Sequence, residues 1–385
     1  METTSTLEGE KTNMTLLDEF LNDLESLVNL EAGTSNPEGV TQAACVMKQL
    51  FESIGFKAEL VDLGPQVGKG LIATNRPNAP RYDVMLNGHL DTVFPKGEAK
   101  KRPFHFDDAK AYGPGVLDCK AGILSIYYGL KYAKKEDIDR LAIVVALNPD
   151  EETGSTASFP WLASIGRKAQ RVLICEPARA NGALVRARKG SGGFKVEFHG
   201  KTAHAGNNPQ DGRNAAVAMM RFATALYDEC NDFARGTTVN PGVIEGGKIV
   251  NAIPDHAAVT IDVRFWRDQD GENIESKLRE LAAKSWVEGV TAEVTKLFYI
   301  PAMPLSDAAK ELDEHIAEAA RRAGFQAEFV EAGGASDGNH IAESGVPVVD
   351  GCGPAGDNMH TDREFLELAS VERMVRMQAH FYSII

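Results

Sequence analysis

The stretch LAIVVALNPDEE, residues 141–152, indicates the fold more clearly than any other part of the chain. It opens with an unbroken apolar run, which is typical of a strand buried on both faces of a sheet. Two shorter runs, DVMLN at 83–87 and VLIC at 172–175, have the same character. Helical patterns separate these strands. The alternation predicts an α/β fold with a mainly parallel mixed sheet flanked by helices.

Amphipathic spacing predicts the other elements of the outer segments, which are helices over 15–30, 38–54, 120–133 and 306–323 and strands over 58–63, 328–331 and 346–349. Around Gly190 the pattern changes to strands in which polar and apolar residues alternate. These strands are predicted over 193–198 and 258–265, with helices over 214–228 and 272–287. Such strands bury one face and leave the other open. We therefore expect a smaller α+β domain at 190–300, inserted into a catalytic domain formed by 1–189 and 301–385.

Length, charge and cysteine content narrow the class of protein. The 385 residues exceed the roughly 250–300 at which a single core stops growing, so two domains are expected. A formal net charge of −14 argues against a nucleic-acid-binding face. Neither a secretion signal nor a long apolar run is apparent, and the five cysteines form no CxxC pair. We expect a cytoplasmic protein with neither nucleic acid nor membrane as partner.

Acidic and imidazole side chains follow the predicted strands of the outer segments. They are His89, Asp91, Asp118, Glu151, Glu152, Glu176 and His360. Ligands commonly bind outside the carboxyl ends of strands in open α/β sheets, so these side chains can converge there. Each alone has an ordinary explanation, because a strand-end histidine is more often structural and Asp118 could cap the next helix. Their joint occurrence indicates a site.

Two imidazoles and three carboxylates form a ligand set that suits Zn²⁺, and Co²⁺ or Mn²⁺ as well. The set suits two ions, with one carboxylate bridging them. Two ions at roughly 3.5–4 Å can activate a water and polarise a carbonyl. One glutamate of the pair Glu151 and Glu152 can then bind metal while the other acts as general base. Asp91, two residues after His89, is placed to fix the imidazole tautomer.

Five motifs make the chain similar to a known family. NGHLDTV (87–93), YGPGVLDCKAG (112–122), NPDEETGS (148–155), CEPA (175–178) and MHTD (359–362) occur in this order. They resemble the di-zinc aminoacylase/carboxypeptidase family of metallopeptidases, which includes glutamate carboxypeptidase, acetylornithine deacetylase and succinyl-diaminopimelate desuccinylase. The stretch DTVFPKGEAKKRPFHFDDAKAYGPG, residues 91–115, is most similar to glutamate carboxypeptidase.

The resemblance implies a role for each of these residues. The implied zinc ligands are His89 and Glu176 for one ion, His360 and Glu152 for the other, and Asp118 as the bridge between them. Glu151 is implied as general base and Asp91 as the support of His89. Glu rather than Asp at position 176 accompanies carboxypeptidases and deacylases in the family. A cis peptide is implied after Asp118, and we expect the Cys119 side chain to point away from the metals.

The inserted region carries a further part of the resemblance. HGKTAHAGNNPQDGRNAA, residues 199–216, is similar to the family's lid and dimerisation domain. This implies that His204 reaches into a partner's site and stabilises the developing oxyanion. It also implies that Asn251 and Arg264 hold a substrate carboxylate, for which the planar guanidinium is well suited. From the residues alone, Arg264 would be a surface arginine and His204 a turn histidine.

The loop before the last predicted strand leaves two interpretations open. Ser336, Asp337 and Asn339 could line the substrate pocket or form a tight polar turn, and His340 is interpreted as structural.

We predict zinc-dependent hydrolysis of an amide bond next to a free carboxylate, as in glutamate carboxypeptidase, by a homodimer formed through the lid. The substrate is expected to be a small molecule with a free carboxylate. An N-acyl-amino-acid deacylase of the acetylornithine type is the main alternative. A zinc aminopeptidase is disfavoured by Glu176 and Arg264. A catalytically silent metal-binding relative is disfavoured because Glu151 and all the ligands are present.

Overall fold

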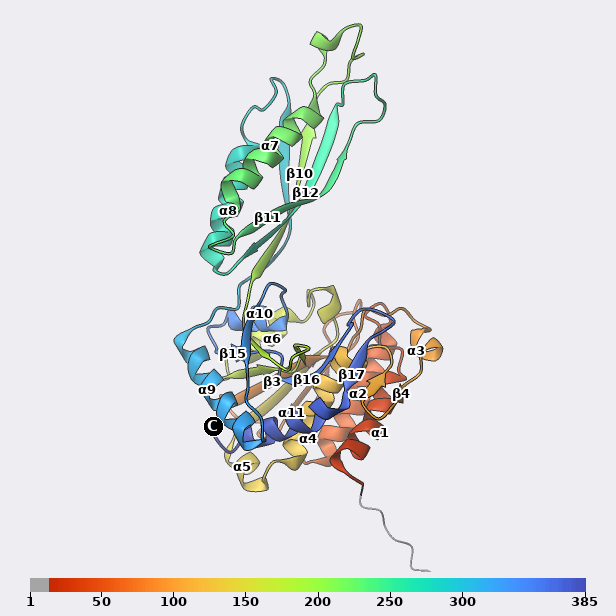
Figure 1. Ribbon diagram of the computed structural model, residues 1–385, viewed down its shortest axis with the longest axis vertical. Helices are drawn as coiled ribbons and strands as arrows, with labels where there is room; N and C mark the ends of the chain where they lie inside the picture. The colour runs from red at the N-terminus through yellow and green to blue at the C-terminus, as the bar shows by residue number, and fades with distance from the viewer. Residues whose placement is uncertain (1–13) are drawn as a thin grey trace, which may run out of the picture.

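The structure, a computed structural model, describes residues 14–385 and consists of a larger body from which an elongated lid projects (Figure 1). The body is built on a six-stranded sheet in the order β1-β2-β6-β3-β7-β15. These strands are β1 (Lys57–Val61), β2 (Gly70–Thr74), β3 (Val84–His89), β6 (Ile143–Asn148), β7 (Val172–Ile174) and β15 (Val348–Val349). The last four run parallel, whereas β1 and β2 pair antiparallel. The mainly parallel mixed sheet is thus confirmed, and 141–152 supplies β6, which like its neighbour β3 is fully buried.

Helices cover both faces of this sheet. Successive residues of β3 show the two faces, because Val84 and Leu86 belong to one core cluster and Met85 to another. The first cluster includes α1 (Leu16–Val28), α2 (Pro37–Ser53), α4 (Gly122–Tyr132), α9 (Asp307–Arg322) and α11 (Leu368–Phe381). The second includes α6 (Phe159–Gly166) and α10 (Asp337–Ala342). Two short helices, α3 (Glu98–Lys101) and α5 (Lys135–Arg140), lie outside these groups.

Short strands form two further sheets in the body, and of these strands the sequence predicted only β14, as 328–331. One has the order β4-β5-β17-β16-β8 and the other pairs β14 with β9. Their bounds are β4 (His105–Phe106), β5 (Lys110–Tyr112), β8 (Pro177–Ala178), β9 (Leu184–Arg188), β14 (Phe329–Ala332), β16 (Gly353–Asp357) and β17 (Phe365–Glu367). Most of these strands are too short to show a periodic pattern. Strands β8, β16 and β17 matter because they pack against the segment that carries Asp118.

The lid is an antiparallel sheet in the order β11-β12-β10-β13 with two helices on one face (Figure 1). Its elements are β10 (Gly190–His199), α7 (Ala215–Cys230), β11 (Thr238–Gly246), β12 (His256–Phe265), α8 (Asp268–Ala282) and β13 (Thr291–Ile300). They share a core of their own, in which Phe194, Phe222 and Leu278 are buried. The domain boundaries at 189/190 and 300/301 stay a prediction.

The chain passes between body and lid twice, and the two passages lie side by side. Arg188 and Met303 exchange two backbone hydrogen bonds of 3.0 Å just outside the lid sheet. We call residues 188–190 and 300–303 the hinge. Within residues 14–385, the helices are all too short or too polar to cross a membrane.

Candidate metal centre

The carboxyl edge of the six-stranded sheet gathers side chains from separate segments of the chain. His89 ends β3, Glu152 lies in the short turn after β6, and Glu176 follows β7. Asp118 comes from an irregular turn before α4, and His360 from the loop after β16. Their donor atoms fall into two groups, each within 4.8 Å, and Asp118 belongs to both.

Asp118 turns one carboxylate oxygen to each imidazole. His89 Nε2 lies 3.0 Å from Asp118 Oδ1 and 3.5 Å from Glu176 Oε1. His360 Nε2 lies 3.1 Å from Asp118 Oδ2 and 3.3 Å from Glu152 Oε2. This is the arrangement expected of a carboxylate shared between two cations.

Two carboxylate oxygens of the cluster are available to bind cations. Oε1 of Glu152 and Oε1 of Glu176 are buried, and neither has a hydrogen-bond partner within residues 14–385. A buried carboxylate oxygen without a partner is costly, and a cation can satisfy both. Nitrogen and carboxylate donors suit Zn²⁺, with Co²⁺ or Mn²⁺ as further fits.

The carboxylates of the cluster also shift the pKa values of its members. Hydrogen bonds to Asp118 and Glu152 raise the pKa of His360 to about 10. Burial opposes ionisation of Asp118, but hydrogen bonds from His360 and His89 outweigh it and lower its pKa. Burial raises the pKa of Glu176 well above its usual range. A cation that enters must therefore displace protons.

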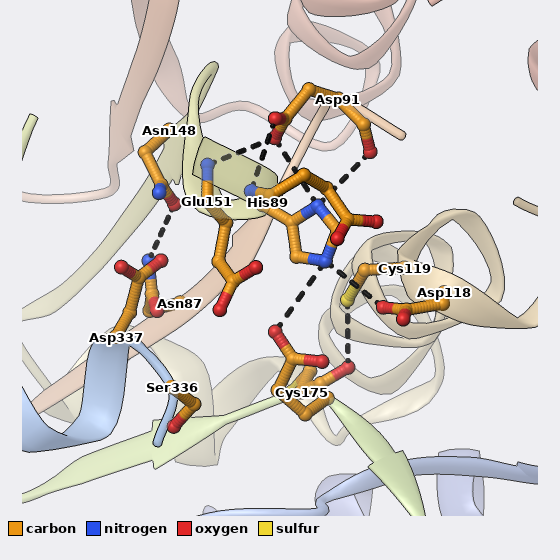
Figure 2. Close-up of polar contacts among 12 residues, drawn as sticks. Asn87, His89, Asp91, Asp118, Cys119, Asn148, Glu151, Cys175, Ser336 and Asp337 are labelled. Atoms are coloured by element: carbon orange, nitrogen blue, oxygen red, sulfur yellow. Dashed lines mark hydrogen bonds and ion pairs between the residues drawn. The ribbon is translucent and has the colours of Figure 1, made fainter. Parts of the chain in front are cut away.

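Asp91 lies between His89 and the turn that follows β6. His89 Nδ1 is 3.0 Å from the backbone carbonyl oxygen of Asp91 and 3.3 Å from its Oδ1 (Figure 2). The Asp91 carboxylate also accepts hydrogen bonds from the backbone N–H groups of Glu151 at 3.1 Å and Glu152 at 3.3 Å. Thr34 donates a third at 2.6 Å. One carboxylate thus orients an imidazole and the Glu151–Glu152 turn together.

Glu151 directs its side chain into the space between His89 and Asp337 (Figure 2). It lines a cavity of about 170 Å³ together with Ile300, Ser336, Asp337 and other residues. Burial raises the pKa of the Glu151 carboxyl well above its usual range. A carboxylate placed in this way can exchange a proton with a molecule in the cavity.

Comparison with known proteins agrees with this geometry. Residues 186–290 match the family model of the peptidase dimerisation domain, M20_dimer. Carboxypeptidase G2 of Pseudomonas sp. (strain RS-16) is 30% identical over 361 residues, which cover 92% of this chain and 86% of that protein. The chain belongs to the M20 peptidase family. Like the relatives it matches, this M20 protein is a metallohydrolase.

Other matches are more distant. A succinyl-diaminopimelate desuccinylase of Cupriavidus taiwanensis is 26% identical to the M20 protein over 374 residues, covering 90% of this chain and 94% of that protein. The crystal structure of aminopeptidase PepT from Bacillus cereus superposes with a TM-score of 0.77 at 22% identity, covering 95% of this chain and 99% of that chain. At this identity the likeness shows the fold, a catalytic body with a lid.

The expectation for Cys119 in this M20 protein is wrong. Its Sγ does not point away but lies within 4.8 Å of donor atoms of His89, Asp118 and Glu176. The peptide between Asp118 and Cys119 is cis, as the resemblance implied, and both residues have non-helical backbone angles. The directions of a regular helix therefore do not apply. The thiol donates to the carbonyl oxygen of Cys175 at 3.2 Å, and burial raises its pKa well above the usual range.

Glu364 is a site residue that the sequence analysis missed. Only 1% of it is exposed, and its carboxylate accepts hydrogen bonds from the backbone N–H groups of Gly115 and Leu117 at 2.9 Å and Asp118 at 3.0 Å. It therefore holds the turn that presents Asp118 to both imidazoles. Its one signal in the sequence is an acidic residue shortly after His360.

The lid residues of the M20 protein do not join the cluster. His204 is exposed, and its Nδ1 accepts hydrogen bonds from the backbone of Gly206 and Asn207 at 3.1 Å. Asn251 is also exposed, and it lies beside His204, because its backbone carbonyl oxygen accepts a hydrogen bond from Ala205. Their loops lie at the end of the lid farthest from the body (Figure 1).

Arg264, by contrast, lies near the body. It pairs with Ser191 close to the hinge, and its Nε donates to Asp262 at 3.0 Å. The three predicted lid residues therefore occupy opposite ends of one sheet.

The loop before α10 fits both interpretations left open by the sequence. Ser336 and Asp337 line the cavity beside Glu151, and Ser336 and Asn339 also form a capping box at the start of α10. His340 stacks on Phe159 with ring centroids 5.0 Å apart and borders the same cavity.

Proposed function

We propose that this M20 metallohydrolase cleaves an amide bond next to a free carboxylate, as a glutamate carboxypeptidase does, with Glu151 as the general base. The position of Glu151 carries the proposal. Its backbone is fixed by Asp91 beside the ligand Glu152, and its half-buried side chain faces a cavity at the cluster (Figure 2). The 30% identity to carboxypeptidase G2 supports this substrate class.

We infer that the protein holds two Zn²⁺ ions, with Asp118 shared between them. The ligands would be His89 and Glu176 for one ion and His360 and Glu152 for the other. Two ions at such a site supply a polarised carbonyl and an acidified water. The two unpartnered oxygens of Glu152 and Glu176 support the assignment.

The chain's own groups then manage protons and orientation. The Glu151 carboxylate takes a proton from the attacking water and returns it to the leaving nitrogen. Burial raises its pKa, and a carboxyl with a raised pKa is suited to return the proton that it has taken. The Asp91 carboxylate holds the Glu151 turn and His89 in register during this exchange.

Substrate binding requires the lid to move. Arg264 has its Nε held by Asp262, and its two terminal nitrogens make no hydrogen bond within residues 14–385. They could therefore grip a carboxylate in a bidentate manner when the lid closes. Arg264 is near the body, so closure of its own lid can bring it to the cluster.

His204 and Asn251 call for a second chain, because the loops that carry them, between β10 and α7 and between β11 and β12, lie at the far end of the lid (Figure 1). A homodimer formed through the lid would bring these residues to a partner's site, where His204 stabilises the oxyanion. The match to the dimerisation domain supports this assembly. So do the exposed apolar side chains of Val243 and Ile244 on the edge strand β11, which would otherwise face water.

An N-acyl-amino-acid deacylase is the second candidate, and the desuccinylase relative at 26% identity favours it. Both activities use the same cluster and Glu151, and they differ in which side of the amide is recognised. A catalytically silent metal-binding protein is the least favoured candidate, since Glu151 is present and lines the cavity at the site.

The deciding experiment is a release assay on the zinc-loaded protein. The panel pairs acyl-glutamates and folate-like conjugates with acetylornithine, other N-acyl amino acids and dipeptides with a free N-terminus. Turnover of a glutamate conjugate, lost in Glu151→Ala, supports the carboxypeptidase. Turnover of other N-acyl amino acids alone would replace it with the deacylase, and turnover of free dipeptides alone with an aminopeptidase. If no substrate of the panel is turned over with two ions bound, the catalytically silent metal-binding protein becomes the favoured candidate.

A further inference from the structure

We propose that the first turn of α10 couples the hinge of the lid to the turn that carries Glu151, and that Asn339 and Asp337 are the positioning residues of this coupling. The proposal rests on the proposed function in one respect, the role of Glu151 as general base. The contacts that carry it lie outside the metal cluster.

Asn339 connects both passages of the hinge with one side chain. It is fully buried, and its Nδ2 donates to the carbonyl oxygens of Lys189 at 3.1 Å and Pro301 at 2.8 Å. Lys189 immediately precedes β10, and Pro301 immediately follows β13. Because both N–H groups of the amide are used, the lid cannot rotate at the hinge without moving Asn339 or breaking these bonds.

Asp337 connects the same turn to the catalytic side. Its Oδ1 accepts a short hydrogen bond from the hydroxyl of Ser155, which is itself held by Asn148 Nδ2 at 3.2 Å. Ser155 has a φ of 53°, in the left-handed region, and its backbone N–H donates to the Asp150 carbonyl oxygen at 2.9 Å, which closes the turn that contains Glu151. A non-glycine residue holds such a conformation only when its surroundings enforce it.

A second set of contacts binds this turn to the hinge. Arg188 Nε donates to Asp350 Oδ2 at 2.6 Å, and Ser336 Oγ donates to the same oxygen at 2.5 Å. Arg188 Nη1 also donates to the Gly334 carbonyl oxygen at 3.0 Å. The ion pair is buried, so breaking it would leave an uncompensated charge. The hinge and the segment before α10 therefore move together.

The turn itself is rigid enough to transmit a displacement. The Ser336 hydroxyl accepts from the backbone of Gly338 at 3.1 Å, while Asn339 Oδ1 accepts from the backbone of Ser336 at 3.0 Å. This capping box makes 336–339 one unit. A shift of the hinge thus reaches Ser155 through two residues of one helical turn. The position of the lid therefore affects the orientation of the Glu151 side chain. Small displacements of a general base have large effects on the rate.

The first test is a double-mutant cycle on the best substrate of the panel. Asn339→Ala removes the hinge contact and Ser155→Ala removes the contact to Asp337, and these two side chains share no hydrogen bond within residues 14–385. Each is expected to lower kcat about tenfold with KM within about twofold. If both act through one turn, the double variant also loses about tenfold. Independent structural roles would instead give a loss of about a hundredfold and overturn the proposal.

The matched control is Glu343→Ala, at the exposed end of the same helix, which is expected to leave kcat unchanged. A loss in this variant as large as that in Asn339→Ala would mean that α10 is merely structural. Should Asn339→Ala not fold, Asn339→Asp keeps the acceptor for Ser336 and replaces the two donors to the hinge with a carboxylate oxygen, which repels both hinge carbonyls.

The second test measures the hinge without turnover. Spin labels on the exposed Cys45 of α2 and on Ser276→Cys of α8, with Cys230→Ser, report the distance between body and lid. Excess unlabelled protein keeps the distances within one chain. Asn339→Ala is expected to broaden the distribution and Ser155→Ala to leave it unchanged. An unchanged distribution in Asn339→Ala would refute the clamp. An inactive wild type with this broadening would refute the role of Glu151 and not the clamp.

Discussion

The carboxyl edge of the body sheet and the open end of the lid hold their polar side chains in different ways. At the sheet edge, Asp118 is fixed by two imidazoles and by three backbone hydrogen bonds to Glu364 around it. At the end of the lid, His204 is exposed and held only by neighbours in its own loop. The first region is arranged for its ligands by one chain. In the function proposed above, the second would gain its contacts from movement of the lid or from another chain.

This difference separates two kinds of substitution. Changes at the sheet edge should alter metal binding or proton transfer within each chain. Changes in the lid should alter activity without altering metal content, and those at its far end should depend on the partner.

Replacement of the proposed base should have the largest effect. Glu151→Gln keeps the size of the side chain and removes its capacity to take a proton, so kcat should fall by about 10⁴-fold. Zinc content, measured by atomic absorption, should stay at the wild-type level because Glu151 is not a proposed ligand. Loss of zinc along with activity would count against the division of roles between Glu151 and Glu152.

Replacement of His204 tests the far end of the lid. His204→Ala should lower kcat by about 10²-fold, the effect of losing an oxyanion donor. If His204 acts across the dimer, mixing His204→Ala with Glu151→Gln should restore activity, because one site of each mixed dimer carries neither change. Failure of the mixture to regain activity, with subunit exchange verified, would place His204 outside the partner's site.

Replacement of Glu364 should lower zinc affinity through the turn that holds Asp118. In Glu364→Gln, the amide N–H must face one of the backbone N–H groups that the carboxylate now accepts from. We expect zinc affinity to fall by about 30-fold in chelator competition, as for other groups that orient ligands. Asp362→Asn, an exposed position two residues earlier, is the control and should bind zinc normally.

Zinc affinity should rise with pH. The pKa of His360 is raised to about 10, so the metal-free protein keeps this proton at neutral pH and must release it to bind an ion. Affinity should therefore increase by about tenfold per pH unit per proton below that pKa, and fall as the pH drops. Calorimetric titration at pH 6 to 8 in buffers of different ionisation enthalpy would count the protons. Affinity that does not vary over this range would contradict the assignment.

The smallest effect is expected at the near end of the lid. Arg264→Lys keeps the charge but loses the planar fork, so KM for a carboxylate substrate should rise about fivefold with little change in kcat. Steady-state kinetics on the best panel substrate would measure it. A substrate amide in place of the carboxylate should remove the difference between Arg264→Lys and wild type.

The sequence predicted what depends on long periodic segments. Strand β6 and the side chains after β3, β6 and β7 could be found because strands buried on both faces are continuous apolar runs. Strand β2 and short strands such as β4 and β5 carry no such pattern and were missed. The lid residues came from family resemblance, because exposed His204 and Asn251 show no distinctive local pattern.

Two errors at the site have separate physical origins, a contact between distant segments of the chain and an irregular local turn. Glu364 binds backbone groups around Asp118, almost 250 positions away, and such contacts do not depend on the residue types bound. Cys119 was placed wrongly because its direction follows from an irregular turn and not from helical spacing.

The pairing of the two hinge segments means that the lid could be exchanged by protein engineering. Arg188 and Met303 form a hydrogen-bonded antiparallel pair, which is the geometry that closes a β-hairpin. A two-residue turn can join such a pair, so everything between them could be exchanged for a short loop without altering the path of the remaining chain. The lid is in this sense an insertion between the two strands of a hairpin. Lids of different length or partner preference could be inserted at the same junction.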